Sequence, residues 1–290
     1  MLQKLFAVLV VMLFSPALAG SFPLSLKDDL GRTVLLKSEP KRIISMLPSH
    51  TEALFALGVG SKVVGIDQFS NYPKAETEKI QKVGSTFTPN LEAIAALKPD
   101  LVLIDDSAYS KLAENLEKIG VVVYAGMAQT YIESFEKIAI LGRLTGATNK
   151  AQSIISRLRS EINQIGVQLL RVKKVSVYFE VDPTPYAAGE ASFIGELLSR
   201  AGGKNIVSKS LGAFPQISPE LVIQANPSVI LGVTLADVSS RPGWANIAAI
   251  QNKRVYKPSS EENDAIVRGG VRLAEALRTL VKYLHPSNAH

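Results

Sequence analysis

The chain has 290 residues, of which 47% are hydrophobic and 20% charged, and its 32 lysines and arginines exceed its 26 acidic residues to give a net charge of +6. This composition is ordinary for a globular protein of one or two domains, and the scattered basic residues disfavour a nucleic-acid-binding protein. The chain contains no cysteine, which excludes disulfides, thiol catalysis and a cysteine-linked lipid anchor.

The first 19 residues have the pattern of a secretory leader. Lys4 supplies a positive charge, residues 5–14 are all apolar, and Ala17 and Ala19 form a small-residue cleavage site. An apolar run of about ten residues is too short to span a bilayer comfortably. We therefore expect cleavage near Ala19 and a freely soluble periplasmic protein.

The first half of the remaining chain alternates short apolar runs with helical segments. Ser49 and Glu52 have the spacing of a capping box at the start of a helix, and Gly58 is suited to end that helix. Alternating strands and helices with short joints predict a parallel sheet covered on both faces. The expected elements are a hairpin at 25–26 and 33–36, strands at 41–47, 63–66 and 121–124, and helices at 49–57 and 107–119.

One stretch occurs twice. Residues 90–104 align without a gap with residues 218–232, which places Glu92 on Glu220. Each copy predicts a short helix, a proline that stops it and a buried strand. Ser218 can cap the second helix, and Thr88 or Asn90 the first. Each glutamate falls in the first turn of a helix, where the helix dipole stabilises a carboxylate. The local pattern by itself therefore indicates a residue that stabilises the helix N-terminus and does not indicate a binding role.

A long helix is expected between the two copies. Residues 149–171, which follow a helical region at 132–144, carry an apolar stripe at helical period and contain no strand signal. Such a helix is either a rigid spacer between two halves or one more covering helix of a single large domain. The domains we expect are an N-terminal lobe at 20–147, an interlobe helix at 148–172 and a C-terminal lobe at 173–290.

The second half repeats the plan of the first half. Gly202 and Gly203 close its first helix, and Trp244, the single tryptophan of the chain, lies in its short third helix. The expected elements are strands at 174–181 and 254–256, helices at 192–200, 242–250 and 271–284, and the second copy of the repeat.

Catalysis and metal binding find little support in the residue types. His50 is the single histidine outside the C-terminal tail, no G-x-S-x-G elbow is present, and the paired glycines match no nucleotide-binding pattern. A zinc or manganese site commonly needs several histidines, which one interior histidine cannot provide. We therefore expect no enzyme, no bound metal and no cofactor.

A ligand cleft remains, at the edge of the sheets where the strands end. Loops after parallel strands gather at this edge and bind ligands in open α/β sheets. Recurrent aromatic residues in these loops suit a large, partly flat organic ligand. The loop residues expected there are Leu47, Pro48, Ser49, Phe69, Tyr72, Phe87, Asp105, Asp106, Tyr109, Tyr186, Phe214 and residues 261–268.

Several of these segments resemble one family. The run from Arg42 to Glu52, the segment Asn71 to Pro73, and the combination of 90–92 with 97–101 are similar to the helical-backbone (class III) periplasmic binding proteins, which serve importers of cobalamin, ferric siderophores and haem. The resemblance extends over about residues 23–285. It implies an α/β fold of two lobes, each with a mainly parallel sheet, joined by one long helix, with a ligand between the lobes.

The corrinoid-binding members are the most similar. By that resemblance Glu92 and Glu220 dock onto arginines of an ABC permease, which works with its ATPase at the inner membrane, and Asp264 and Arg268 frame the corrinoid. Phe69 stands where the family has a Tyr, and Tyr186 where it has a Phe. Phe87, Phe214 and Asp105 stand where it has Trp. The resemblance implies a monomeric receptor for cobalamin or a related corrinoid.

Three alternatives stay open at this point. The first is a receptor for a ferric siderophore or haem in the same importer class. The second is an enzyme that uses the interlobe cleft with His50 as its base. The third is a sensor or structural module that does not engage a permease.

Overall fold

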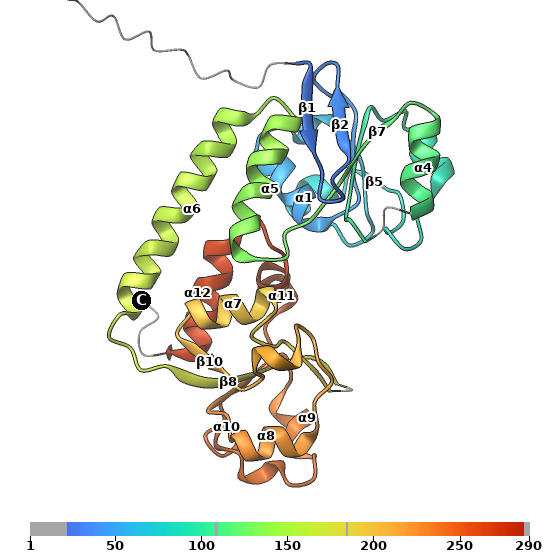
Figure 1. Ribbon diagram of the computed structural model, residues 1–290. Helices are drawn as coiled ribbons and strands as arrows, with labels where there is room; N and C mark the ends of the chain where they lie inside the picture. The colour runs from blue at the N-terminus through green and yellow to red at the C-terminus, as the bar shows by residue number, and fades with distance from the viewer. Residues whose placement is uncertain (1–21, 108–109, 184, 287–290) are drawn as a thin grey trace, which may run out of the picture.

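The computed structural model describes residues 22–107, 110–183 and 185–286, so the expected leader and Tyr109 lie outside the described residues. Figure 1 shows two α/β halves, one above the other, with the long helix α6 (Thr148–Leu169) along one side. The α/β fold of two lobes joined by one long helix is therefore confirmed. The numerical domain boundaries stay a prediction.

The N-terminal half is built on a parallel five-stranded sheet with the order β5-β4-β3-β6-β7. Because β4 and β6 flank β3, the chain reverses its direction of winding there, and loops on either side of this point diverge to leave a crevice. The strands are β3 (Ile43–Ser45), β4 (Val63–Ile66), β5 (Gln81–Lys82), β6 (Leu101–Ile104) and β7 (Val122–Ala125). The hairpin of β1 (Leu24–Lys27) and β2 (Thr33–Leu36) is antiparallel. The helices are α1 (Pro48–Ala56), the 3-10 helix η1 (Gly60–Lys62), α2 (Lys74–Thr77), α3 (Leu91–Ala96), α4 (Ser110–Lys118) and α5 (Tyr131–Leu144).

The C-terminal half has a second sheet, with the order β10-β8-β11-β12 and β9 paired antiparallel to β8. Its strands are β8 (Val175–Asp182), β9 (Tyr186–Ala187), β10 (Gly203–Asn205), β11 (Val229–Leu231) and β12 (Val255–Tyr256). Its helices are α7 (Phe193–Arg200), α8 (Pro219–Ala225), α9 (Leu235–Ser239), α10 (Ala248–Gln251), α11 (Ser260–Val267) and α12 (Leu273–Leu284), with 3-10 helices η2 (Lys209–Leu211) and η3 (Trp244–Asn246). The main ladder is parallel, as the repeated plan predicts.

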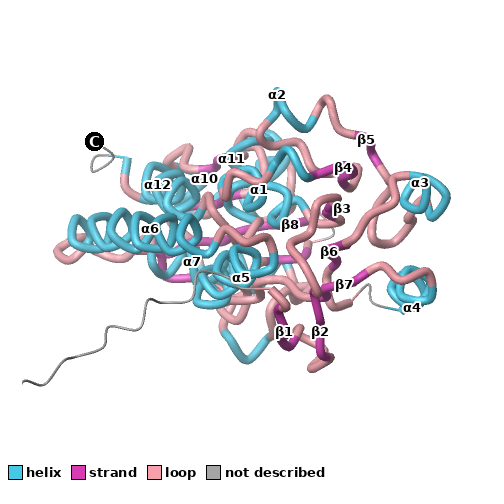
Figure 2. Tube along the Cα trace, turned by 90° about the horizontal axis from the view of Figure 1, so that it is seen from above, coloured by secondary structure: helices cyan, strands magenta, loops and turns pink. Residues whose placement is uncertain are grey.

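The two halves share one apolar core. Helix α6 buries the stripe Ile154, Leu158, Ile162 and Ile165, and it packs against α5 of the first half and α12 of the second. A single cluster of buried side chains runs from β3 and β6 through α5, α6, α7 and α12 to β8 and β11. Figure 2 shows the helices α12, α6, α7 and α5 gathered beside the strands of the N-terminal sheet. Opening one half away from the other would therefore expose apolar surface.

The two copies of the repeat fold as predicted. Asn90 caps α3 by accepting a hydrogen bond from the backbone N–H of Ala93, and Ser218 caps α8 in the same way through Leu221. The strands that follow, β6 and β11, are fully buried at the centre of their sheets.

The helix signals at three places were misread. The prediction of a capping box at Ser49 is wrong. Leu47 occupies the N-cap position without a side-chain hydrogen bond, and α1 begins at Pro48. Residues 261–268, expected as a loop, belong mostly to α11, which has a capping box formed by Ser259 and Glu262. The helix expected at 242–250 is divided at Ile247 into η3 and α10. The short elements α2, β5, β9, β10 and α9 were not predicted, because two to five residues carry too little periodicity.

Within the described residues, no helix has both the length and the apolarity needed to cross a membrane.

Gly232 is the position where a side chain would disturb the C-terminal sheet most. Its φ is +94°, and a Cβ atom there would lie 1.9 Å from the carbonyl oxygen of Glu180. We expect Gly232→Ala to lower the free energy of unfolding by roughly 2–4 kcal/mol, because it combines backbone strain with a clash. Thermal unfolding followed by circular dichroism measures this loss.

Gly166 provides the matched control. A Cβ atom at this position in α6 would meet nothing within 4 Å, and the backbone is helical. Gly166→Ala should therefore leave the protein equally stable or raise its stability by up to about 1 kcal/mol. Equal effects of the two substitutions would contradict the assignment of strain to Gly232.

Candidate ligand cleft

Four aromatic side chains are exposed, three in loops and Tyr186 in the short strand β9. Phe69 and Phe87 belong to the N-terminal half and are 57% and 83% exposed, and Tyr186 and Phe214 belong to the C-terminal half and are 41% and 52% exposed. Within the described part of the chain, these are the only exposed Phe, Tyr or Trp side chains. Exposed aromatic surface of this kind marks a place where another molecule binds. All four were predicted as cleft residues.

The other predicted loop residues differ in their accessibility. Leu47, Pro48 and Ser49 are partly buried at the end of β3, where α1 begins. Asp105 is buried after β6, and its carboxylate accepts a hydrogen bond from the hydroxyl of Ser107. Contact of these residues with a ligand stays a prediction.

Arg268 is held by partners from both halves. One of its terminal nitrogens (Nη1) donates to Glu52 Oε1 and to Asn71 Oδ1, each at 2.8 Å. The other (Nη2) lies 3.0 Å from Asp264 Oδ2 and donates to the carbonyl oxygen of Phe69 at 3.3 Å. Asp264 also accepts a hydrogen bond from Asn71 Nδ2 at 2.8 Å. The resemblance placed Asp264 and Arg268 against the ligand; in the structure their polar atoms are engaged with the protein.

Glu52 is the buried centre of this group. Its side chain is 1% exposed and that of Arg268 is 10% exposed. Burial raises the pKa of Glu52, while the hydrogen bond and positive charge of Arg268 and the charge of Arg272 oppose that rise. A buried carboxylate without such partners would be strongly unfavourable. The buried carboxylate of Glu52 and its cationic partners therefore depend on one another, because removing one leaves another buried charge without compensation.

Two other cationic side chains near the cleft are also paired with carboxylates. Arg272 is bound by Glu275, lies 3.8 Å from Glu52, and stacks over the ring of Tyr72 at 4.3 Å. Arg241 makes two hydrogen bonds to Glu180, at 2.6 and 2.7 Å. The positive charge of these arginines is therefore compensated within the protein.

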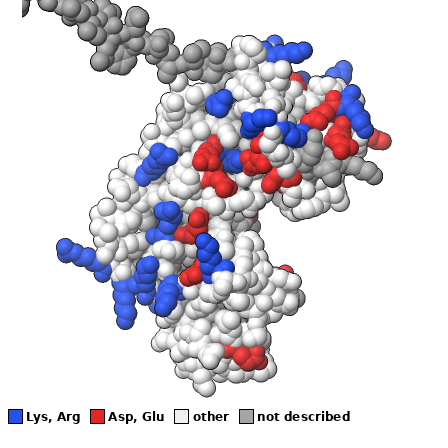
Figure 3. Space-filling view, viewed as in Figure 1, with Lys and Arg blue, Asp and Glu red and all other residues white. Residues whose placement is uncertain are grey.

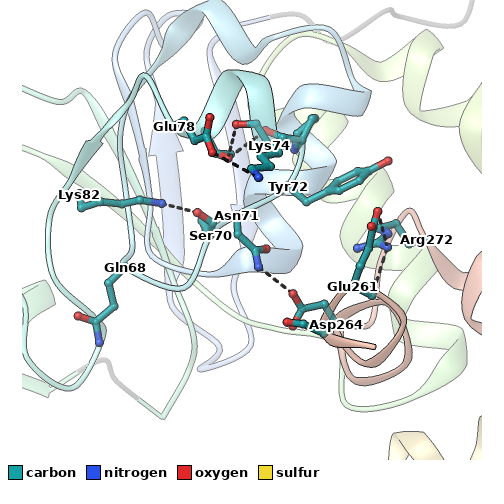
Figure 4. A pocket seen from close by; sticks show the side chains of 13 residues that line it. Gln68, Ser70, Asn71, Tyr72, Lys74, Glu78, Lys82, Glu261, Asp264 and Arg272 are labelled. Carbon is teal, nitrogen blue, oxygen red and sulfur yellow. Dashed lines mark hydrogen bonds and ion pairs between the residues drawn. The ribbon is translucent and has the colours of Figure 1, made fainter. Parts of the chain in front are cut away.

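Two cavities are lined in part by residues of α11, and Ser260 lines both. The larger, of about 650 Å³, is shown in Figure 4, where Asn71 and Asp264 meet across it. Its lining comes from both halves, namely Gln68, Ser70, Asn71, Tyr72, Pro73, Lys74, Thr77, Glu78, Lys82, Ser260, Glu261, Asp264 and Arg272. The second, of about 440 Å³, lies where β8, β11 and β12 end, and its lining includes Val181, Val233, Lys257, Asn263 and Val267. Figure 3 shows the surface notched between the two halves on the side away from α6.

Glu92 and Glu220 are exposed in the first turns of α3 and α8, one in each half. Neither makes an ion pair with any residue that the structure describes. Their carboxylates are therefore available to a partner. Their role in docking stays a prediction.

His50 does not line the cleft. It is buried in α1, its ring centre lies 6.4 Å from that of Tyr124, and neither ring nitrogen has a hydrogen-bond partner among the described residues. The described residues also contain no group of three or more His, Cys, Asp or Glu side chains placed to hold a metal ion.

Sequence reasoning missed Glu52 as a cleft residue, although a signal was present. Glu52 is the only Asp, Glu, Lys or Arg between Arg42 and Lys62. A lone charge inside a long uncharged segment is expected to be buried and to need a partner of opposite sign. Residues 261–268, which include Asn263 and Val267 of the second cavity, were predicted as cleft residues. Asn71, Arg272 and the other residues of that cavity carried no comparable signal, because only the folded protein places them beside α11.

Two α/β halves that together line a cavity of about 650 Å³ form the architecture of a ligand-binding protein. A profile of the periplasmic binding proteins matches residues 43–261. The chain belongs to this family, and it acts outside the cytoplasm.

Individual relatives show the same likeness over most of the chain. An uncharacterised ABC transporter substrate-binding lipoprotein of Bacillus subtilis is 34% identical over 277 residues, which cover 91% of this chain and 86% of the relative. A cobalamin-binding protein of Halobacterium salinarum is 32% identical over 247 residues, which cover 82% and 67%. The crystal structure of the periplasmic vitamin B12 binding protein of Vibrio cholerae is 25% identical, has a TM-score of 0.73, and covers 87% of this chain and 99% of that chain. A periplasmic haem-binding protein of Roseiflexus is also 25% identical, with a TM-score of 0.75 and coverage of 86% and 99%.

The buried position of His50 has a consequence for acid stability. Burial, with a smaller contribution from the charge of Lys137, lowers the pKa of His50 from 6.5 to about 3. The unfolded chain therefore takes up the proton first as the pH falls, so the free energy of unfolding should decrease between pH 6.5 and 3, by at most about 1.4 kcal/mol per pH unit. Urea unfolding of the wild type and of His50→Leu across this range measures the difference.

We expect the His50→Leu curve to fall less steeply with pH, because the leucine carries no proton in either state. His285, whose pKa burial also lowers, is present in both proteins and cancels in the comparison. Parallel curves would show that His50 is not held neutral by the fold.

Proposed function

We propose that the protein is the substrate-binding component of an ABC importer and that it carries cobalamin or a related corrinoid between its two halves. The observation that carries this proposal is the set of four exposed aromatic rings, two on each half. Exposed aromatic surface on both halves suits a large, partly planar ligand. The named activities of the Halobacterium and Vibrio relatives support the same ligand class.

The charges around the cleft favour a corrinoid over the alternatives. A ferric siderophore or haem carries anionic groups that need uncompensated cations, and the Roseiflexus relative shows that haem binders share this fold. Here Arg268, Arg272 and Arg241 are each bound to carboxylates of the protein. A corrin ring rimmed by neutral amides makes no such demand. Lys82, which lines the first cavity, and Lys257, which lines the second, make no ion pair among the described residues and are the cations available to a polar group of the ligand.

Delivery would use the two exposed glutamates. Glu92 and Glu220 stand five and six residues after Phe87 and Phe214, so each acidic side chain follows one aromatic of the cleft wall. Interfacial charge pairs can each contribute a few kcal/mol, although desolvation offsets part of that gain. We infer that their main contribution is register, because two carboxylates on a rigid body match two cationic sites on a two-fold permease. The leader would be removed near Ala19, leaving a free periplasmic monomer.

Ligand binding can be tested directly. We expect cyanocobalamin to bind in isothermal titration, and Phe69→Ala or Phe214→Ala to weaken binding about fivefold, because each removes about 1 kcal/mol of aromatic contact. Leu170→Ala, at an apolar side chain that is even more exposed at the end of α6, is the control and should leave affinity unchanged. Tighter binding of a ferric hydroxamate or haem than of cyanocobalamin would overturn the corrinoid assignment.

Docking is tested by transport. The double substitution Glu92→Ala with Glu220→Ala should abolish uptake in cells that carry the cognate permease, while the affinity measured by titration stays at the wild-type value. Exposed glutamates elsewhere, Glu114 and Glu136, provide the matched double substitution, which should transport normally. Lost affinity with intact uptake would refute the docking role.

A further inference from the structure

Arg268 connects the two halves at one point. It follows the last residue of α11 in the C-terminal half, yet three of its partners (Glu52, Phe69 and Asn71) belong to the N-terminal half. The pair with Glu52 joins positions 216 residues apart. A guanidinium group has a planar, fixed set of donors, so these partners define its position and orientation.

The Arg268 contacts reach the ligand loop itself. The donated bond to the carbonyl oxygen of Phe69 holds the backbone from which one exposed ring projects. Asn71, two residues later, is bound both to Arg268 and to Asp264 of α11. The wall that carries Phe69 is therefore fastened to the opposite half before any ligand is present.

The segment after Arg268 is packed between the halves. A Cβ atom on Gly269 would lie 3.0 Å from Ser134 Oγ of α5, 3.1 Å from the Cβ of Ala128, and 3.4 Å from the ring of Phe193 of α7. Helix α5 belongs to the N-terminal half and α7 to the C-terminal half. A glycine at this position lets the chain pass between them with little space to spare.

We propose that Glu52 is a positioning residue for ligand binding. It holds Arg268 in the geometry that fixes the separation of the halves and the place of Phe69, so that Arg268 acts as an interlobe clamp and not as a ligand contact. The effect on affinity rests on the proposed function; the effect on the separation of the halves does not.

The ligand-free protein gives the first test. Because the chain has no cysteine, Glu114→Cys in α4 and Gln251→Cys in α10 introduce one specific site for a spin label in each half. Pulsed electron paramagnetic resonance then measures the distance between the two labels. The otherwise wild-type protein should give one narrow distribution. Glu52→Gln and Arg268→Met should each broaden it or shift it to longer distance. Arg278→Met, which removes the exposed pair with Glu161 between α12 and α6, should not change it.

Cyanocobalamin affinity gives the second test. Glu52→Gln and Arg268→Met should each weaken cyanocobalamin binding at least tenfold. The affinity of the double variant should be no lower than that of the single variant with the lower affinity, because both residues act through the same clamp. Arg268→Lys keeps the positive charge but loses the planar set of guanidinium donors. Its affinity for cyanocobalamin should lie between the affinities of the wild type and Arg268→Met. The double variant removes both charges of the pair and leaves neither of them buried and unpaired. It should therefore fold and can be measured even if a single variant fails to fold.

The outcomes are distinguishable. An unchanged distance distribution in both single variants overturns the clamp; if affinity is nevertheless lost, Arg268 contacts the ligand directly. Additive losses of affinity in the double variant also overturn it. If the wild type does not bind cyanocobalamin, the corrinoid proposal fails, and the distance measurement still decides the clamp.

Discussion

The ion pair between Glu52 and Arg268 is the constraint on which the geometry of the cleft depends. A carboxylate that is almost fully buried in α1 cannot keep its charge without a cation, and the nearest cation is supplied by the other half of the molecule. The two halves can therefore not separate at this point without leaving a buried charge unpaired. Because the same arginine binds the loop of Phe69, the position of an aromatic wall is tied to the position of α11.

The shared apolar core also opposes separation of the two halves, and it does so over a larger area than the ion pair. The buried cluster that passes through α5, α6, α7 and α12 belongs to both halves, and the stripe of α6 lies along it. Removing such surface from contact costs about 25 cal/mol per Å² of newly exposed apolar area. Wide opening of the cleft is therefore unfavourable, and a ligand meets walls that are already largely in place. Pre-formed walls reduce the entropy cost of binding.

Charge compensation then shapes the kind of ligand that fits. Arginines near a cleft commonly recognise carboxylates or phosphates, but here the protein's own carboxylates already occupy three of them. What remains accessible is aromatic surface from both halves, beside a larger cavity whose lining is mainly polar. The two exposed glutamates lie outside this balance, each at the start of a short helix, where the helix dipole stabilises their charge. The same molecule thus combines arginines that are paired within the protein with two exposed glutamates that make no ion pair among the described residues.

Much of the fold could be predicted from the sequence, because the signals that determine it act over a few residues. The caps at Asn90 and Ser218, the glycine that ends α1 and the apolar runs of β3, β4, β6 and β11 are all local. Local signals also placed Phe69, Phe87 and Phe214 in loops and the long helix between the halves, whereas Tyr186, expected in a loop, lies in β9. They failed at Ser49 and Glu52, where a capping pattern concealed a residue whose partner lies at the far end of the chain.

By itself, then, the sequence determined the order and type of the longer elements, the repeated unit and the aromatic content of the loops, since each depends on hydrogen bonds and side-chain periodicity within a short segment. Only the tertiary structure decided that Arg268 is bound to Glu52 and Asn71, that α11 lines two cavities, and that the rings of Phe69, Phe87, Tyr186 and Phe214 stay uncovered. The physical reason is that burial and charge pairing depend on which distant segments the packed helices and sheets bring together.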